Sequence, residues 1–144
     1  MEKIPSFQKN HHTLTKGLHA QTDQNGITTY DLRFKKPNAG DYLAPKTMHT
    51  VEHLMATVLR NSREKDNIVY FGPMGCRTGF YLLTLNSDRA RTLALLKECI
   101  VRALALDEIP GNKPEECGNY LEHDLPDAKR ELQDYLSVLE HTND

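Results

Sequence analysis

The segment 27–35 alternates, most clearly over residues 30–35, where apolar and charged side chains follow one another. Tyr30, Leu32 and Phe34 share one face, and Asp31, Arg33 and Lys35 share the other. A period of two residues is typical of a strand with one buried face. We therefore expect the polar face of this strand, which includes Arg33, to meet solvent, a partner or a substrate.

Turn signals and short apolar runs mark further strands. The run 22–26 has Asn-Gly at its core, a favoured two-residue hairpin turn, and it directly precedes the first strand. Residues 67–71 and 79–85 are short apolar runs separated by a Gly-Pro-Met-Gly turn, which predicts two more strands. Residues 1–12 are polar, and we expect an extended arm there.

Three segments show helical spacing. The first is expected to begin at Thr47, a plausible N-cap, and to end near Ser62. A second is expected over residues 88–106 with Ser87 as its cap, and a last one begins near residue 126. Strands and helices in mixed order, without repeated βαβ units, predict an α+β domain whose antiparallel sheet carries helices on one face.

Length and composition fit one globular domain. The chain has 144 residues, of which 26% are charged and 38% hydrophobic. A net charge of -2 without any basic block argues against a nucleic-acid or membrane-surface partner. No apolar run approaches the ~20 residues of a membrane span, and the first residues lack a signal-peptide core. We expect a cytoplasmic protein, and the odd number of cysteines, three, argues against a disulfide framework.

The segment His49-Thr-Val-Glu52-His53, in the first predicted helix, is the strongest chemical signal from local spacing. Residues four apart share one helix face, with about 5–6 Å between their Cβ atoms, so His49 and His53 can bind one metal ion together. Glu52 lies one turn from His49 and leans toward the same ion. Two imidazoles beside a carboxylate suit metal-assisted acid–base catalysis.

A third metal ligand must come from elsewhere in the chain. The candidates are Cys76, Cys117, His123 and Asp124. A set of two histidines and one cysteine suits zinc, cobalt or ferrous iron and disfavours magnesium or calcium. Cys76 follows the Gly-Pro-Met-Gly turn and is alternatively a positioned reactive thiol, whereas Cys99 belongs to an apolar helix face and is expected in the core. Cys76 and Cys117 together would instead close a structural Cys₂His₂ zinc site.

Several segments, in order, resemble the LuxS family of S-ribosylhomocysteine lyases. The longest are Met48-His-Thr-Val-Glu-His-Leu-Met-Ala56, Arg60-Asn61 and Pro73-Met-Gly-Cys-Arg-Thr-Gly-Phe-Tyr-Leu82. Shorter agreements are Ser6-Phe7 with His11, Asp31-Leu-Arg-Phe34 with Pro37-Asn38, and Cys117-Gly118 with His123-Asp-Leu125. The Pro-Met-Gly-Cys-x-Thr-Gly run is long and specific, so the resemblance favours an open catalytic site over the closed zinc site.

The resemblance implies a four-stranded antiparallel sheet packed with helices, over one catalytic domain spanning residues 1–144. It implies a homodimer with the active site at the subunit interface. The implied reaction converts S-ribosylhomocysteine to homocysteine and dihydroxypentanedione, the precursor of a quorum-sensing autoinducer, by carbonyl migration and β-elimination. The implied cofactor is one ferrous ion per subunit, for which zinc or cobalt can substitute.

The resemblance also implies roles for individual residues. His49, His53 and Cys117 would hold the metal, Cys76 and Glu52 would move protons, and Ser6, His11 and Arg33 would hold the sugar. We expect the metal and Arg77 to favour the thiolate of Cys76, and Glu52 to act as general acid and base. One departure is Tyr70-Phe71-Gly72, because many members carry Asp-x-Ser there.

Two other functions fit parts of the pattern. The first is a metallopeptidase, because His-x-x-Glu-His, the inverse of the common zinc-protease spacing, also marks a class of proteases. In such an enzyme Glu52 would activate water. In a zinc-stabilised binding module without catalysis, Cys76→Ala would lose metal and folding together. An assay of peptide cleavage distinguishes the peptidase from the lyase. The metal content and folding of Cys76→Ala distinguish the binding module from the lyase.

Overall fold

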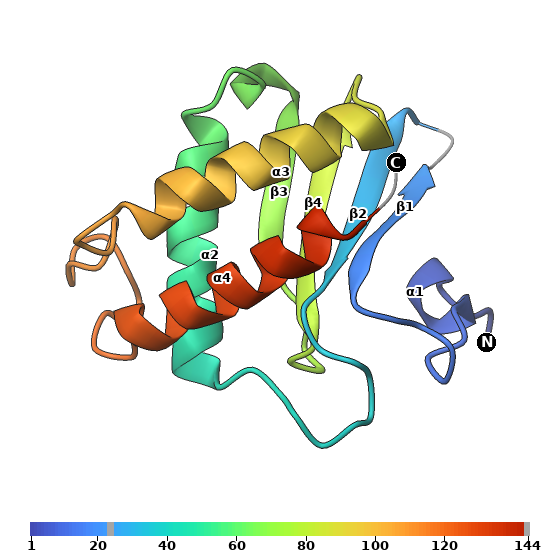
Figure 1. Ribbon diagram of the computed structural model, residues 1–144, viewed down its shortest axis with the longest axis horizontal. Helices are drawn as coiled ribbons and strands as arrows, with labels where there is room; N and C mark the ends of the chain where they lie inside the picture. Colours follow the sequence, from blue (N-terminus) through green and yellow to red (C-terminus); the bar gives the residue numbers. More distant parts are fainter. Residues whose placement is uncertain (23–24, 143–144) are drawn as a thin grey trace.

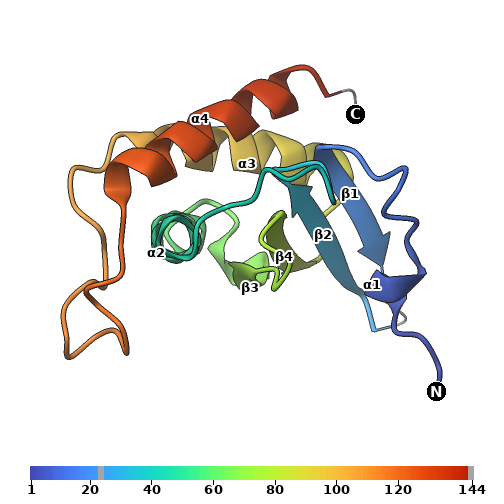
Figure 2. The same ribbon diagram turned by 90° about the horizontal axis from the view of Figure 1, so that it is seen from below.

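The computed structural model describes residues 1–22 and 25–142, which form an antiparallel sheet with three long helices on one side (Figure 1 and Figure 2). The strands are β1 (Gly17–Thr22), β2 (Ile27–Arg33), β3 (Ile68–Pro73) and β4 (Gly79–Leu85), in the order β1-β2-β4-β3. The helices are α1 (Pro5–Gln8), α2 (Pro45–Arg60), α3 (Arg89–Leu104) and α4 (Leu125–Glu140), with a 3₁₀ turn at Lys65–Asn67. The predicted α+β class and four-stranded antiparallel sheet are confirmed.

The two faces of the sheet differ in what covers them. Tyr30 in β2 pairs with Leu82 in β4, and both are fully buried beneath the helices. Their neighbours Thr29 and Leu83 pair on the opposite face and stay partly exposed. No long helix covers this second face in the described residues, so we call it the open face.

Charged residues of β2 lie on the open face, yet they are buried. Asp31 is 0% and Arg33 2% exposed, so of the three alternatives for this polar face, contact with solvent is wrong, and contact with a partner or a substrate stays a prediction. The reason is that the N-terminal arm folds over this end of the sheet. Lys9 of the arm forms an ion pair with Asp31 at 2.9 Å, and Arg33 pairs with the same carboxylate.

The expected helix caps were wrong in two cases. Proline starts α2, where its fixed φ and missing N–H suit the first turn, so no side chain caps this end. The Thr47 hydroxyl instead donates to Asp127 of α4, at 2.6 Å. At α3 the N-cap is Asp88, whose carboxylate accepts the backbone N–H of Arg91, and not the preceding serine.

The N-terminal part holds more structure than the sequence predicted. The expected extended arm contains the short helix α1, and β1 forms before the hairpin turn although its residues lack a clear apolar alternation. β1 pairs with β2 from Thr22↔Thr28 to Gly17↔Arg33, as the hairpin signal requires. Residues 23–24 of that signal lie outside the described part of the chain.

Candidate metal centre and active site

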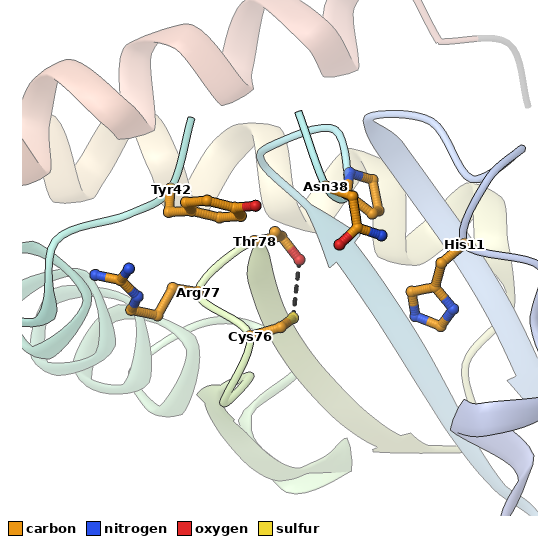
Figure 3. A pocket seen from close by; sticks show the side chains of 7 residues that line it. His11, Asn38, Tyr42, Cys76, Arg77 and Thr78 are labelled. Atoms are coloured by element: carbon orange, nitrogen blue, oxygen red, sulfur yellow. Dashed lines mark hydrogen bonds between the residues drawn. The ribbon is translucent and has the colours of Figure 1, made fainter. Parts of the chain in front are cut away.

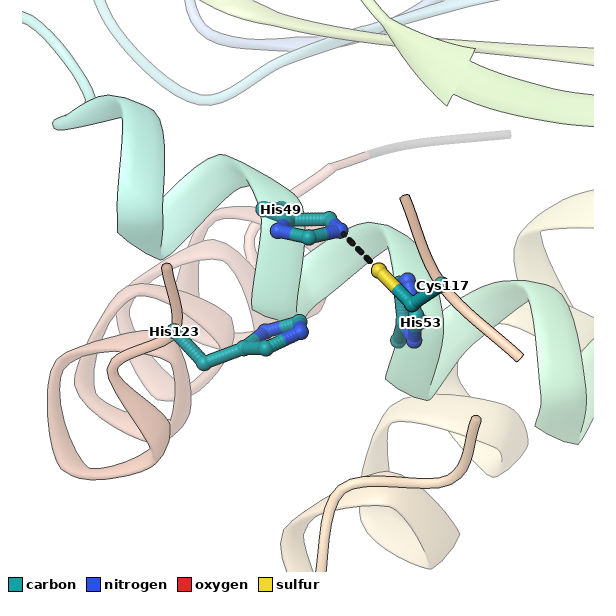
Figure 4. A group of neighbouring side chains, drawn as sticks. All are labelled: His49, His53, Cys117 and His123. Atoms are coloured by element: carbon teal, nitrogen blue, oxygen red, sulfur yellow. Dashed lines mark hydrogen bonds between the residues drawn. The ribbon is translucent and has the colours of Figure 1, made fainter. Parts of the chain in front are cut away.

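Three histidines and one cysteine meet beside α2 (Figure 4). His49 and His53 come from one face of the helix, and Cys117 and His123 come from the segment before α4. One ligand atom of each lies within 4.8 Å of the others. The structure therefore brings together the predicted ligands His49, His53 and Cys117, and adds His123.

Backbone carbonyls orient the two helical imidazoles. Nδ1 of His49 lies 2.8 Å from the carbonyl oxygen of Glu122, and Nδ1 of His53 lies 2.8 Å from that of Pro110. A carbonyl only accepts, so each Nδ1 carries the proton and each Nε2 keeps its lone pair. Histidines that bind metals are usually held in this way. Cys117 Sγ lies 3.3 Å from His49 Nε2, so two nitrogens and one sulfur fit a common ion.

His123 lies beside this ligand set rather than within it. Its ring stacks on His49 with centroids 4.0 Å apart and planes at 20°. Two nearly parallel rings cannot both point an in-plane lone pair at one nearby ion. Burial, followed by the charges of the neighbouring His49 and His53, lowers the pKa of His123 to about 4. His123 is therefore neutral at physiological pH.

Glu52 lies between the metal cluster and the loop that carries Cys76. It lines a cavity of about 330 Å³ together with His49 and the loop residues Met74 and Gly75. Its carboxylate is partly exposed and lies 4.0 Å from His53 Nε2. A carboxylate in this place can exchange protons with a molecule bound in the cavity.

Cys76 is exposed and borders a second cavity, of about 250 Å³ (Figure 3). Its sulfur lies 3.0 Å from Thr78 Oγ1 and 3.8 Å from Arg33 Nη1. The Arg77 guanidinium points away and lies over the Tyr42 ring, 5.7 Å from its centroid. The cation beside the sulfur is therefore Arg33, and the expectation for Arg77 is wrong. Thr78 carried no signal in the sequence beyond its place in the conspicuous Cys-Arg-Thr-Gly run.

The three residues expected to hold a sugar lie together at Cys76. Ser6, His11 and Arg33 line a cavity of about 320 Å³ that Cys76 also borders. Ser6 and His11 belong to the N-terminal arm, which the ion pair between Lys9 and Asp31 ties to β2. Arg33 lines this cavity, although its side chain is only 2% exposed.

The glycine in the segment Tyr70-Phe71-Gly72 is explained by the packing of Tyr70. Phe71 belongs to the core, whereas Tyr70 lies on the open face, where its phenol ring folds across Gly72. A Cβ atom at Gly72 would overlap with that ring. A larger residue at 72 thus requires Tyr70 to move.

The family model and the relatives that match this chain share one description. The family model described as S-ribosylhomocysteinase (LuxS) matches residues 4–144. An S-ribosylhomocysteine lyase of Phocaeicola vulgatus is 45% identical, over 98% of this chain and 92% of the relative. Lyases of the same description from Porphyromonas gingivalis and Borreliella burgdorferi are 43% and 42% identical, over 94% and 96% of this chain and 90% and 93% of the relatives. Within the described residues, no helix is both long and apolar enough to span a membrane.

Proposed function

The chain belongs to the S-ribosylhomocysteinase (LuxS) family, and we propose that it cleaves the thioether of S-ribosylhomocysteine to homocysteine and dihydroxypentanedione. The match along residues 4–144 carries this proposal. The site supports it, because a thiol, a carboxylate and a set of metal ligands are the groups that such a reaction needs.

The reaction is a sequence of proton transfers followed by loss of a thiolate. Sulfur on carbon 5 of the ribose is a poor leaving group until a carbonyl stands at carbon 3. Moving the carbonyl from carbon 1 through carbon 2 to carbon 3 takes protons from carbon and returns them, without net oxidation. The carbonyl at carbon 3 then acidifies carbon 4, whose proton leaves as the bond between carbon 5 and sulfur breaks. Proton-transfer groups of this kind typically contribute ~10²–10⁴-fold each.

We propose that His49, His53 and Cys117 hold one ferrous ion per subunit, for which zinc or cobalt can substitute. Two imidazole nitrogens and one thiolate suit these ions and disfavour magnesium or calcium. When bound, the ion supplies Lewis acidity that stabilises negative charge on substrate oxygens.

The proton-transfer roles fall to Cys76 and Glu52. The Cys76 sulfur is exposed to its cavity and takes protons from carbon, while the Glu52 carboxylate moves protons among the substrate oxygens. Ser6, His11 and Arg33 hold the sugar, since they surround the same sulfur. Tyr70-Phe71-Gly72 stands where many members carry Asp-x-Ser, and if that carboxylate positions the amino-acid end of the substrate, this chain holds that end differently.

The proposal includes a homodimer with the active site at the interface. The open face exposes Tyr70 and Leu85 and leaves Tyr81 and Leu83 half-buried, an apolar surface suited to a second copy. The residues proposed for one active site line different cavities of this chain. Cys76 borders cavities together with the proposed sugar-binding residues, whereas His49 and Glu52 line another cavity. A second subunit can bring these two groups of residues into one site. We further propose that residues 1–144 form one catalytic domain that works in the cytoplasm.

A thiol-release assay with S-ribosylhomocysteine tests this function directly. Protein purified without oxygen is assayed as wild type beside Cys76→Ala, and both are analysed for metal. Homocysteine is expected from the wild type only, with equal metal in both, because the substitution removes the proton carrier and no metal ligand. A folded, metal-loaded wild type that releases no thiol would refute the proposal. Casein cleavage, or joint loss of metal and folding in Cys76→Ala, would point to the peptidase or the binding module.

A further inference from the structure

Thr78 lies between a buried guanidinium and the Cys76 sulfur. Arg33 Nη1 lies 2.7 Å from Thr78 Oγ1, and the same oxygen lies 3.0 Å from Cys76 Sγ. Figure 3 shows the hydroxyl of Thr78 directed at the sulfur on the wall of the cavity. Thr78 itself is only 2% exposed, so water does not replace these contacts.

The direction of the hydrogen bonds follows from the donors. Arg33 has no acceptor, so Thr78 Oγ1 accepts from it. The one hydroxyl proton of Thr78 then needs an acceptor of its own, and among the described residues the sulfur is the one within reach. The reverse direction, from a thiol to the hydroxyl oxygen, would leave a buried O–H without a partner, which is costly. The sulfur is therefore the acceptor.

The donor is held rigidly. Two guanidinium nitrogens of Arg33 bind the two carboxylate oxygens of Asp31, which is fully buried. The backbone carbonyl of Thr78 accepts the N–H groups of both Phe34 and Lys35, each at 2.9 Å. The hydroxyl thus has a fixed place, and its contact with Cys76 does not depend on a mobile side chain.

We infer that Thr78 is a positioning residue, which relays the buried Asp31–Arg33 pair to Cys76 and keeps the sulfur as a hydrogen-bond acceptor facing the cavity. A sulfur that accepts a hydrogen bond is stabilised as thiolate, the form that takes a proton or attacks an electrophile. The consequence for turnover rests on the proposed lyase function, whereas the effect on the reactivity of the sulfur does not.

Alkylation of Cys76 by iodoacetamide, followed by peptide mass spectrometry, tests this relay. Thr78→Val keeps the shape of the side chain and removes the hydroxyl. At neutral pH it should slow alkylation of Cys76 at least about tenfold, the usual effect of losing a hydrogen bond to a charged group. Thr78→Ser keeps the hydroxyl and should react as the wild type does.

Thr84→Val is the matched control. Thr84 is as buried as Thr78 and lies in β4, the strand that begins directly after Thr78, but its hydroxyl makes no hydrogen bond with the described residues. Its alkylation rate at Cys76 should equal that of the wild type. If the lyase activity is also present, Thr78→Val should lower kcat by a similar factor and leave KM nearly unchanged.

Two results would overturn the inference. One is a folded Thr78→Val that alkylates at the wild-type rate at neutral pH. If Thr78→Val does not fold, Thr78→Ala removes the same hydroxyl with a smaller side chain. The other overturning result is a Thr78→Ser variant whose Cys76 is alkylated as slowly as that of Thr78→Ala. Alkylation needs no substrate, so a wild type that releases no homocysteine would refute the proposed function and leave this test readable.

Discussion

His49 and His123 stack in the candidate metal centre, and the stacking separates the proposed metal ligands from their neighbour. Residues in one cluster of potential ligands are not equivalent, because a ligand must point its lone pair at the ion. His49, His53 and Cys117 meet this requirement, while His123 lies parallel to one of them. Of the four groups in the cluster, we therefore expect three to bind the ion.

The different positions of Cys117 and His123 predict different metal contents for variants of these two residues. Cys117→Ala should lose most of its metal, whereas His123→Gln should keep a content close to one ion per chain, because it removes no donor. Elemental analysis after dialysis against a mild chelator measures both. We expect affinity to fall at least about tenfold in Cys117→Ala. Equal losses in the two variants would show that His123 is a ligand.

Arg33 illustrates what alternation cannot predict for a single residue. Its position in β2 is correct, but the arm that covers it comes from residues 1–12 and leaves the side chain 2% exposed. Periodicity reports the face on which a residue lies. It does not report what else packs against that face.

Two helices are joined at their first turns, and this contact frames the site. Thr47 of α2 donates to Asp127 of α4, and the segment that leads into α4 carries His123. Asp127 also binds Arg130 one turn along its own helix. The contact between Thr47 and Asp127 therefore fixes how the segment that carries Cys117 and His123 approaches α2.

The same contact predicts a pH-dependent contribution to stability. The Thr47 hydroxyl, followed by Arg130, lowers the pKa of Asp127 below its ordinary 3.8. The native state thus favours the carboxylate, and the stabilisation is present above pH 3.8 and lost as the pH falls through the lower native value. Asp127→Asn should lower the free energy of unfolding by about 1 kcal/mol at pH 7.

Urea unfolding at pH 7 and near pH 3 measures this effect. The difference between Asp127→Asn and the wild type should shrink at the lower pH, because below pH 3.8 the unfolded carboxyl is protonated and the stabilisation from the lowered native pKa declines. Asp134→Asn, on the exposed side of α4, is the control and should change stability little at either pH. A difference that stays constant with pH would contradict the assignment.

At the scale of the whole molecule, the proposed dimer depends on the open face of the sheet. Leu83 lies near its centre, paired with Thr29 of β2 and next to Tyr70 of β3. If a second copy covers this face, Leu83→Arg buries an unpaired charge in the interface and should raise the Kd of the dimer by roughly a hundredfold or more. Light scattering during size-exclusion chromatography measures the change.

Lyase activity should fall together with the dimer, because the proposed site needs both subunits. Val101→Arg is the control, since Val101 is exposed on α3, away from the open face. It should leave the dimer and the activity unchanged. A Leu83→Arg monomer with wild-type activity would separate the active site from the interface, and a monomeric wild type would refute the dimer.

Local patterns determined much of this protein. Alternation and turn signals located β2, β3 and β4, and the spacing of His49 and His53 placed both on one helix face, because each of these features depends on residues close in sequence. The Pro-Met-Gly-Cys-x-Thr-Gly run pointed to the family that the comparisons then showed. Cys99 lies in the core as its helix face predicts, and burial raises the pKa of its thiol to about 11.

Only the tertiary structure decided which of the chemical groups meet. Lys9 reaches Asp31, Arg33 reaches Thr78 and Cys76, and His49 stacks on His123. These partners lie far apart in the chain, and no periodicity links them. Their contacts follow from strand order and helix packing, which set distances and burial between segments. The thiol therefore has Arg33 rather than Arg77 as its cation, for reasons that no local pattern contains.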